Sequence, residues 1–274
     1  MLDGRAPVSR LPLRQLKAIY PYSLDPARER EYGLPRFEVW ESIRSTNDRA
    51  RELAVEGSPR GSLVLSWEQT EGRGRQGNTW FSAAGDGVWM SLVLGANDVT
   101  TQLPLLVGIS CAEVIEELTD VIVSIKWPND LMIKGRKVGG VLVEMGDGWV
   151  VAGIGINVRR SPSESLQAFS SRALTATSIA EHSDRISEIP GFAGLFAQRI
   201  LARLDAGKGQ GGVVDSFSAR DMLRGLRVHT DELGIGIARG IDECGMLLLE
   251  REDGSIVEVR SGSVRSITSS EEEE

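Results

Sequence analysis

The chain has 274 residues, of which 41% are apolar and 26% are charged, an ordinary composition for a globular protein with a sizeable core. A formal net charge of −8 disfavours a general nucleic-acid binder, because such proteins carry a basic surplus. Two cysteines that lie far apart argue against a disulfide framework or a zinc site. The sequence shows neither an apolar run long enough for a membrane nor the apolar stretch of a signal peptide, so a cytoplasmic location is expected.

The first 36 residues mix Pro, Arg and Leu without sustained periodicity, and a short helix over residues 11–20 is the element that they suggest. We interpret residues 1–36 as an N-terminal extension, too short for an independent DNA-binding domain with its own core. From Phe37 the pattern sharpens. Residues 36–43 predict a strand, and a helix follows that begins after Ser45 and closes near Gly57.

The middle of the chain alternates strand and helix patterns. Apolar, β-branched runs predict strands at residues 62–67, 87–95, 121–127, 137–145 and 149–158. The last two flank an Asp-Gly turn and predict a hairpin. Helical length and periodicity predict helices at residues 103–118, 175–182 and 191–207, with loop between 158 and 189 around the second of them.

Beyond residue 222 the pattern changes to short strands separated by turn residues, the spacing of a small barrel. The expected division is an extension at 1–36, a mixed α/β domain at 37–222, a small β domain at 223–270 and an acidic tail at 271–274. No G-x-G-x-x-G motif opens a helix after a first strand, so a dinucleotide-binding Rossmann site is not supported.

The stretch EGRGRQGNTWF, after the strand at 62–67, combines flexible backbone with positive charge. Gly72 and Gly74 allow the backbone to approach a ligand closely. Arg73 and Arg75 supply forks that suit carboxylate or phosphate. A tryptophan near its end, at position 80, can offer a flat face to a base. The stretch indicates an anionic ligand, with a basic surface loop as the alternative.

Three further clusters place polar side chains at strand ends. In KWPND, Asn129 and Asp130 follow a strand; Asp130 could hold Mg²⁺ or orient an arginine, and a common Pro-Asn-Asp turn is the alternative. Lys137 begins an apolar strand and could reach into a pocket beside Gly140, or be a strand-end charge. Asn157 ends a buried strand, and the start of a turn is its alternative role.

No cluster decides the question alone, but their order along the chain is specific. From Phe37 onward the chain resembles the biotin protein ligases, also called holocarboxylase synthetases. The matching stretches are STN at residues 45–47, Gln69 with GRGRQGNTW, KWPND, KVGGVLVE, GIGINV, ATSI at residues 176–179 and GIARGIDECGMLLLE. The resemblance implies a mixed sheet with helices like that of the class II aminoacyl-tRNA synthetases, with a C-terminal SH3-like β-barrel.

The resemblance also implies an ATP-dependent, AMP-forming ligase. Such enzymes activate biotin as biotinyl-5′-AMP with release of pyrophosphate, and then pass the biotinyl group to one lysine of a biotin carboxyl carrier domain of acetyl-CoA or pyruvate carboxylase. ATP and Mg²⁺ are the expected co-substrate and metal, and no tightly bound cofactor is expected. Because a carboxylate must attack the α-phosphate, two anions have to meet, which needs cations in a site with little water.

Site residues follow from the same resemblance. The expected catalytic residues are Arg73, Lys137 and Asp130, with Asp130 also as a ligand of Mg²⁺. The expected biotin-binding residues are Ser45, Thr46, Asn47, Gln69, Gly72, Arg73, Gly74, Arg75, Lys137, Gly140 and Gly153. The expected ATP-binding residues are Arg73, Arg75, Trp80, Asn129, Asp130, Lys137 and Asn157.

At the biotin end, the resemblance assigns the reading of the ureido ring to Ser45, Thr46 and Gln69. A neutral ring with donors and acceptors suits neutral hydrogen-bonding side chains. An N-cap of the following helix is the other interpretation of Ser45 and Thr46, and both roles can coexist. Gly140 and the strand after it are expected along the thioether ring and the valeryl chain.

At the nucleotide end, the resemblance has Lys137 contact both the biotin carboxylate and the phosphate, while Arg73 orders the loop over the intermediate. Trp80 is expected to stack on adenine, and Asn157 to recognise the edge of the base. Asp130 is a candidate to help the acceptor lysine lose its proton.

Two other functions stay open at this point. Lipoate–protein ligases share the fold and the adenylation chemistry, although lipoyl has no ureido ring to be read. A non-catalytic, biotin-responsive binding protein would not need the three cations Arg73, Arg75 and Lys137, all of which are present. Some members of the family carry an N-terminal winged helix-turn-helix and act as repressors; residues 1–36 are too few for that domain, so no operator DNA binding is expected.

Overall fold

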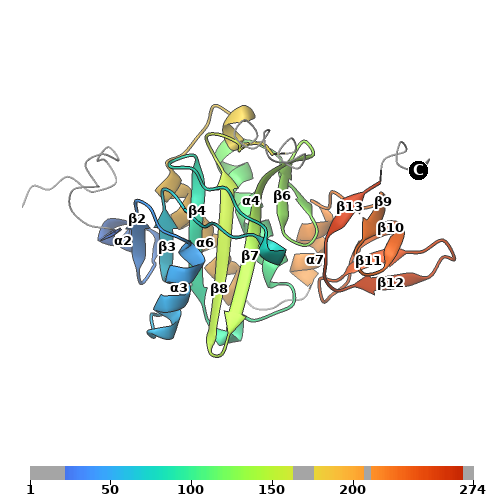
Figure 1. Cartoon of the computed structure of the whole chain (residues 1–274), viewed down its shortest axis with the longest axis horizontal. Helices are drawn as coiled ribbons and strands as arrows, with labels where there is room; N and C mark the ends of the chain where they lie inside the picture. Colours follow the sequence, from blue (N-terminus) through green and yellow to red (C-terminus); the bar gives the residue numbers. More distant parts are fainter. Residues whose placement is uncertain (1–21, 163–175, 207–210, 268–274) are drawn as a thin grey trace, which may run out of the picture.

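The computed structural model describes residues 22–162, 176–206 and 211–267. In these residues two sheets and their helices form the fold (Figure 1). The larger sheet has the strand order β1-β2-β3-β4-β8-β7-β6-β5 and the smaller the order β12-β11-β10-β9-β13. β2 and β3 run parallel, and the other neighbouring strands of both sheets run antiparallel.

The larger sheet is built around long apolar strands. Its strands are β1 (Tyr22–Leu24), β2 (Phe37–Trp40), β3 (Leu63–Ser66), β4 (Gly87–Leu94), β5 (Ser124–Lys126), β6 (Asp130–Ile133), β7 (Arg136–Gly146) and β8 (Trp149–Asn157). Every residue of β4 is buried, as expected for a central strand that is covered on both faces.

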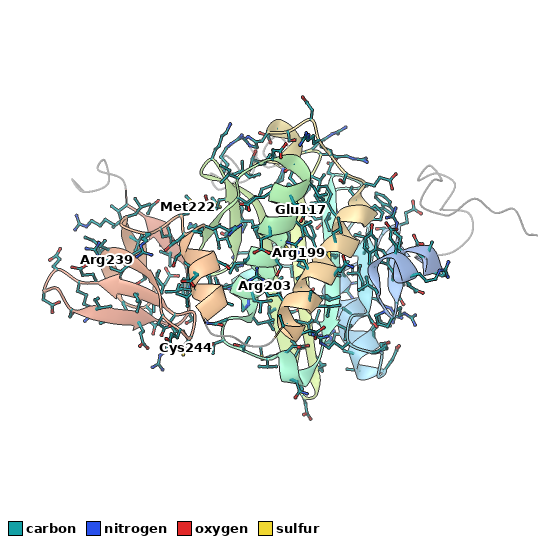
Figure 2. All side chains as sticks on the ribbon, turned by 180° about the vertical axis from the view of Figure 1, so that it is seen from behind. Glu117, Arg199, Arg203, Met222, Arg239 and Cys244 are labelled. Atoms are coloured by element: carbon teal, nitrogen blue, oxygen red, sulfur yellow. The ribbon has the colours of Figure 1, made fainter. Side chains whose placement is uncertain are left out.

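Helices cover both faces of this sheet (Figure 1). They are α2 (Pro26–Tyr32), α3 (Thr46–Val55), α4 (Leu103–Thr119), α6 (Ile189–Asp205) and α7 (Gly211–Ser218). α4 and α6 lie together on one face, where ion pairs join Arg199 to Glu117 and Arg203 to Glu113 on their outer side (Figure 2). α3 lies on the opposite face, in front of β3, β4 and β8.

The α3 face of the sheet has a small apolar cluster of its own. Ala50 and Leu53 of α3 pack there on Val64, Val93 and Val151. Side chains alternate between the faces of a strand, so further along β8 the same face presents two glycines in place of valines. The helix therefore covers only part of this face, and the remainder is the floor of the site described below.

The smaller sheet consists of β9 (Arg227–Thr230), β10 (Gly234–Ile241), β11 (Leu247–Glu250), β12 (Ile256–Val259) and β13 (Val264–Ser266). It lies beside the β5–β6 end of the larger sheet, with α7 between the two (Figure 1). The turn between β10 and β11 is attached to the larger unit by hydrogen bonds from Thr101, Gln102 and Trp127 to backbone carbonyl oxygens of residues 243–245.

The mixed α/β architecture with a C-terminal antiparallel β unit is confirmed, as are the hairpin at β7–β8 and the helices at α3, α4 and α6. The predicted strand at residues 121–127 begins only at Ser124, and the short helix near residues 175–182 is a single 3₁₀ turn at Ile179–Glu181. The elements β6, α7, β9 and β13, which are all short, were not predicted. The helix expected at residues 11–20 and the tail at 271–274 lie outside the described residues.

Part of the segment that was interpreted as an extension joins the larger sheet. β1 pairs with β2, and α2 follows with Asp25 as its N-cap and Gly33 as its left-handed C-cap. Tyr32 at the end of α2 packs against Gly194 of α6, where an added Cβ would lie 2.2 Å from the tyrosine ring. These elements are too short to give a periodic signal, and tertiary contacts hold them in place.

Two general properties follow from the described residues. None of their helices has both the length and the apolarity needed to cross a membrane. Both cysteines are free; Cys111 is buried in α4 and Cys244 is exposed in the β10–β11 turn.

Candidate active site

The floor of the site is the part of the α3 face that carries glycines. In the β7–β8 ladder Gly140 is paired with Gly155, Leu142 with Gly153, and Glu144 with Val151. All three pairs point to the same face, because residues two apart in a strand share a face. The glycines leave a shallow surface on which larger side chains from α3 and from the loop before β4 can lie.

Asn47 lies directly on Gly153. A Cβ at Gly153 would come within 2.3 Å of Asn47 Oδ1, so only glycine allows this position. The Ser91 hydroxyl of β4 lies 2.5 Å from Asn47 Oδ1 and 2.7 Å from Thr46 Oγ1. Asn47 Nδ2 donates to Glu144 Oε2 at 2.7 Å. The start of α3 is thus fixed to the floor by neutral polar groups, together with one carboxylate.

Gln69 organises the other side of the α3 N-terminus. Its Oε1 accepts from the Thr46 backbone N–H at 2.8 Å and from Thr46 Oγ1 at 3.0 Å, and its Nε2 donates to Ser82 Oγ at 2.8 Å. Gln69 therefore performs the capping that was considered for the STN hydroxyls. Ser45 occupies the N-cap position, but its side chain makes no capping hydrogen bond, and Thr46 does not cap either because its hydroxyl donates to Gln69.

The Gly-Arg stretch forms a small arm in which residues 72–74 and 78–80 run beside each other. Trp80 N donates to Gly72 O, and Gly74 N donates to Asn78 O. Gly72 is required sterically, since a Cβ there would lie 2.3 Å from Trp80 O. The arm is anchored through Arg75, whose Nη1 donates to Asn129 Oδ1 of the KWPND turn at 3.0 Å.

Arg73 is held by two carboxylates. Its Nη1 and Nη2 donate to both oxygens of Asp48, each at 2.9 Å, and Nη2 also donates to Glu144 Oε2 at 3.2 Å. The hydrogen bonds from Arg73 hold the pKa of Asp48 below its ordinary value, although partial burial opposes this effect. Asp48 and Glu144 were not predicted as site residues. For Glu144 a signal existed, because it shares the strand face of Gly140.

Trp80 and Lys137 meet over Gly155. The indole lies against this glycine, where a Cβ would be 2.4 Å from Nε1, and Lys137 Nζ is 5.3 Å from the ring centroid. Trp80 also makes an edge contact with Trp89 at a centroid distance of 6.4 Å. Its Nε1 is buried and has no hydrogen-bond partner in the described part of the chain. An aromatic surface therefore lies beside a cation.

The cations at this end of the floor form a cluster around one carboxylate. Lys137 Nζ lies 2.5 Å from Asp130 Oδ1. The pKa of Lys126 is lowered, chiefly by burial; Asp130 opposes this effect, while Lys137 and Arg265 add to it. Lys126 and Arg265 were not predicted as site residues. Arg265 is on β13 of the smaller sheet, so only the tertiary structure brings it here.

The ATSI segment runs alongside Lys137. Thr177 N donates to Lys137 O at 2.9 Å, and Asn157 Nδ2 donates to Thr177 O at 2.9 Å. Asn157 is 2% exposed, so its amide is largely committed to orienting this segment. It also borders a small cavity of about 90 Å³ that is lined in part by Phe81, Trp89 and Arg160.

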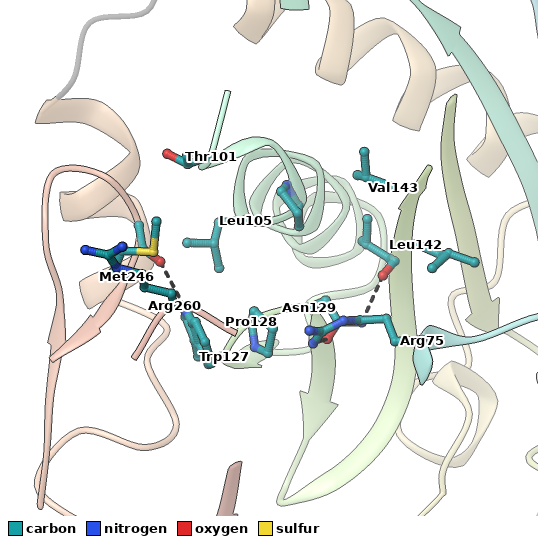
Figure 3. A pocket seen from close by; sticks show the side chains of 13 residues that line it. Arg75, Thr101, Leu105, Trp127, Pro128, Asn129, Leu142, Val143, Met246 and Arg260 are labelled. Carbon is teal, nitrogen blue, oxygen red and sulfur yellow. Dashed lines mark hydrogen bonds between the residues drawn. The ribbon is translucent and has the colours of Figure 1, made fainter. Parts of the chain in front are cut away.

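A larger cavity, of about 260 Å³, lies where the arm, β7, the start of α4 and the smaller sheet come together (Figure 3). Leu105, Trp127 and Pro128 form an apolar wall, and Arg75 and Arg260 supply its charges. Arg75 and Asn129 lie close together at the border of this cavity (Figure 3), and the hydrogen bond between them ties the arm to the KWPND turn.

The structure thus brings the predicted site residues into one region. Thr46, Asn47, Gln69 and Gly153 gather at the start of α3, whereas Trp80, Asp130, Lys137 and Gly140 gather at the other end of the floor. Arg73 and Arg75 connect the two through the arm. Gly74 makes room for Asn78, whose backbone oxygen would lie 3.3 Å from an added Cβ. A region with neutral hydrogen-bonding groups at one end and cations with an aromatic ring at the other can bind a neutral ring and an anion together.

Comparison with known proteins agrees with this geometry. The family of biotin/lipoate A/B protein ligases matches at residues 39–161, and the C-terminal domain of biotin protein ligases matches at residues 227–265. Together these two matches cover β3 to β8 of the larger sheet and nearly all of the smaller sheet. The chain belongs to the biotin protein ligases of this family.

Two curated relatives give the extent of the similarity. The bifunctional ligase/repressor BirA of Bacillus subtilis is 35% identical over 222 residues, which cover 77% of this chain and 68% of the relative. The biotin–[acetyl-CoA-carboxylase] ligase of Mycobacterium tuberculosis is 30% identical over 249 residues, which cover 85% of this chain and 89% of the relative.

A solved structure extends the similarity to three dimensions. The biotin protein ligase from Aquifex aeolicus in complex with biotin and ATP has a TM-score of 0.73 and 29% identity, and the match covers 84% of this chain and 99% of that one. The similarity in space therefore includes nearly the whole of the Aquifex protein.

Proposed function

We propose that this chain adenylates biotin with ATP and transfers the biotinyl group to a lysine of a biotin carboxyl carrier domain. One observation carries the proposal: a single strand face joins a neutral hydrogen-bonding end at Asn47 to a cationic end at Lys137. Gly140 and Glu144 mark these ends on β7, and four residues of strand span about 13 Å. That length suits a small ring with an extended acid chain. Biotin and ATP are the ligands of the Aquifex relative.

The charges explain how the two anions are brought together. Lys137 supplies positive charge where the biotin carboxylate approaches the α-phosphate, and Arg73 orders the arm over the intermediate. Lys126 and Arg265 supply positive charge where pyrophosphate leaves. Such fixed charges stabilise the transition state because they need no reorganisation during the reaction. The buried environment that lowers the pKa of Lys126 also strengthens its interaction with phosphate.

Adenine is proposed to bind on Trp80 and at Asn157. In the structure the indole contacts Gly155, and Lys137 lies over it, so a base that stacks there would also contact the cation. Asn157 donates one amide hydrogen to Thr177 O and borders the small cavity, where its side chain is proposed to meet the edge of the base. The roles of these residues and of the ureido-reading set are part of the proposal.

Magnesium fits this site if a single protein carboxylate binds it together with substrate phosphates and water. The described residues contain no group of three or more His, Cys, Asp or Glu side chains that could hold a metal ion. Mg²⁺ is often bound by one or two carboxylates together with substrate phosphates and water, and Asp130 can supply the carboxylate. When bound, the ion would screen the charge of the leaving pyrophosphate. Asp130 is paired with Lys137, so it also holds that lysine beside the reacting groups.

The acceptor is proposed by analogy with relatives. Two curated relatives, from Mycobacterium tuberculosis and Paracoccus denitrificans, are named biotin–[acetyl-CoA-carboxylase] ligase, so a carrier domain of that carboxylase is the proposed acceptor. Modification of pyruvate carboxylase, a cytoplasmic location and the absence of operator DNA binding stay predictions. A gel-shift assay with duplex DNA, biotin and ATP tests the last of these.

The division of labour between the two sheets is also a proposal. We assign biotin and ATP binding to residues 37–222, in which the floor, the arm and the KWPND turn lie. Residues 223–270 would contribute Arg265, and also Arg260, which lines the larger cavity. The lipoate alternative is not favoured, since the neutral polar groups at the start of α3 suit a ring with donors and acceptors, which lipoyl lacks.

The decisive experiment is titration calorimetry of biotin, and separately of lipoate, with and without Mg-ATP, followed by mass spectrometry. Tight binding of biotin and a mass corresponding to biotinyl-AMP are expected, and addition of a carrier domain should discharge this intermediate. Binding of biotin without adenylate would contradict the ligase and favour a biotin-responsive binding protein. Adenylation of lipoate in preference to biotin would contradict the substrate.

A further inference from the structure

The guanidinium of Arg73 is shared by two carboxylates from different elements. Asp48 lies in the first turn of α3, and Glu144 lies on β7. Three of the five N–H groups of Arg73 donate hydrogen bonds to these carboxylates, so two N–H groups remain that can donate to a ligand. The bidentate pair with Asp48 is the most specific geometry that an arginine and a carboxylate can adopt.

The two carboxylates act on a segment that has few other attachments. The backbone hydrogen bonds of the arm, such as Trp80 N to Gly72 O, connect it chiefly to itself. Side chains join it to the rest of the protein through Arg75 with Asn129, through Gln76 with Ser263 at 3.3 Å, and at its far end through the Trp80 indole on Gly155. The position of the Arg73 guanidinium is therefore set mainly by Asp48 and Glu144.

Glu144 connects this arrangement to the neutral end of the floor. Its Oε2 accepts from both Arg73 Nη2 and Asn47 Nδ2. Asn47 is in turn fixed by the Ser91 hydroxyl and by the space that Gly153 leaves. Any ligand that reorients Asn47 changes the hydrogen bonding of Glu144, and through it the position of Arg73.

We propose that Asp48 and Glu144 are positioning residues, which set Arg73 across the site before a ligand arrives and couple it to Asn47. As far as it concerns retention of the adenylate, this inference rests on the proposed function. Exposed ion pairs generally contribute little to stability. The side chains of Asp48 and Glu144, however, are only 26% and 34% exposed, and they form a network with Arg73 that includes a bidentate pair. We therefore expect the network to contribute measurably to the ordering of the arm.

Hydrogen exchange of the ligand-free protein tests the ordering without any assumption about activity. Asp48→Asn and Glu144→Gln keep the shape of each side chain and remove its charge. Amides of residues 72–80 should exchange about tenfold faster in Asp48→Asn, and also faster in Glu144→Gln, because charge-assisted hydrogen bonds are lost. Glu71→Gln is the matched control, since it removes the exposed pair with Arg44 in the same stretch and should change nothing.

Two outcomes would overturn the ordering role. One is unchanged exchange of residues 72–80 in both variants. The other is faster exchange that extends equally through α4, which would show a general loss of stability instead of a local release of the arm.

Retention of the intermediate tests the functional part. The time for biotinyl-AMP to leave the purified enzyme should shorten about tenfold in Asp48→Asn, with a much smaller change in the rate of its formation, because the arm covers the intermediate. Equal retention in wild type and variant would overturn this part. If the wild-type protein formed no biotinyl-AMP, the proposed function would fail, while the exchange experiment would still decide whether Asp48 and Glu144 position Arg73.

Discussion

At the residue scale, glycines on one strand face decide where the functional side chains lie. Gly153 makes room for Asn47 and Gly155 makes room for Trp80, and in both cases an added Cβ would lie less than 2.5 Å from the neighbouring side chain. The same property that weakens a glycine in a strand thus allows a large side chain to approach the backbone. The positions of the polar and aromatic side chains therefore depend on the absence of a Cβ at Gly153 and Gly155.

We expect Gly153→Ala to displace Asn47 and to break its contacts with Ser91 and Glu144. Biotin affinity measured by calorimetry should fall by about tenfold or more, because a desolvated hydrogen-bonding group is lost. Gly108→Ala in α4 is the control, since nothing lies within 4 Å of its added Cβ. Unchanged biotin affinity in Gly153→Ala would show that Asn47 does not take part in binding.

Lys137 is the cation whose removal should affect chemistry most directly. Lys137→Gln should reduce biotin-dependent pyrophosphate release about 100-fold or more, because a preorganised charge at the reacting anions is lost. Lys134→Gln, three residues earlier and exposed, should retain normal activity. Comparable loss in both variants would contradict the assignment of Lys137.

At the element scale, one buried carboxylate joins β2 to α3. Glu38 is fully buried; it accepts hydrogen bonds from Arg36, Trp40 and Arg49. Burial alone would raise the pKa of Glu38, but the hydrogen bonds from Arg49, Trp40 and Arg36 outweigh it and lower the pKa below the ordinary value of 4.5. Helix α3, which begins at Thr46, is therefore anchored by an ion-pair network to the neighbouring strand.

Glu38→Gln should reduce the free energy of unfolding by about 2 kcal/mol or more at neutral pH, because two arginines lose a buried partner. A carboxyl whose folded pKa is lowered stabilises the protein above its unfolded pKa, and this contribution is lost as the pH falls through the folded pKa. Urea denaturation should therefore show that the difference between wild type and variant narrows below pH 4.5.

Glu52→Gln is the control for this network. Glu52 pairs with the same Arg49, but its side chain is 58% exposed, so a change of only about 0.5 kcal/mol or less is expected. A similar loss in both variants, or a difference that does not depend on pH, would contradict the role of Glu38.

At the scale of the whole molecule, the site is completed by contact between the two sheets. Trp127 Nε1 donates to Gly245 O at 2.9 Å across this boundary, and Gln102 and Thr101 bond to the same turn. These bonds orient the smaller sheet, so that Arg265 comes near Lys126. The arrangement brings a cation of the smaller sheet into the electrostatic environment of Lys126.

Trp127→Phe should keep the apolar packing and leave the Gly245 carbonyl without its donor. Hydrogen exchange in the β10–β11 turn should accelerate, and the stability of the smaller sheet should fall by about 1 kcal/mol. The affinity for ATP should fall with it, whereas biotin affinity should not. Thr101→Val, which removes an exposed bond to the same turn, is expected to have a smaller effect. Equal exchange in wild type and Trp127→Phe would contradict this coupling.

The sequence by itself determined the long elements and the residues that resemble a family motif. β4, β7, β8, α3, α4 and α6 carry enough periodic apolar residues for their burial to be predicted. The arm, KWPND and Lys137 were found because glycine, proline and charge stand out locally in an apolar context. All three lie within residues 39–161, where the biotin/lipoate A/B protein ligase family matches.

The tertiary structure alone decided the partnerships. Asp48 with Arg73 and Gln69 as the cap of Thr46 join residues that are 23 or more positions apart, and no local pattern encodes such pairs. The short elements β1, β6 and β13 also form only because neighbours offer them hydrogen bonds. Local sequence sets the conformational preference of a segment, whereas burial and charge pairing depend on which distant segments meet.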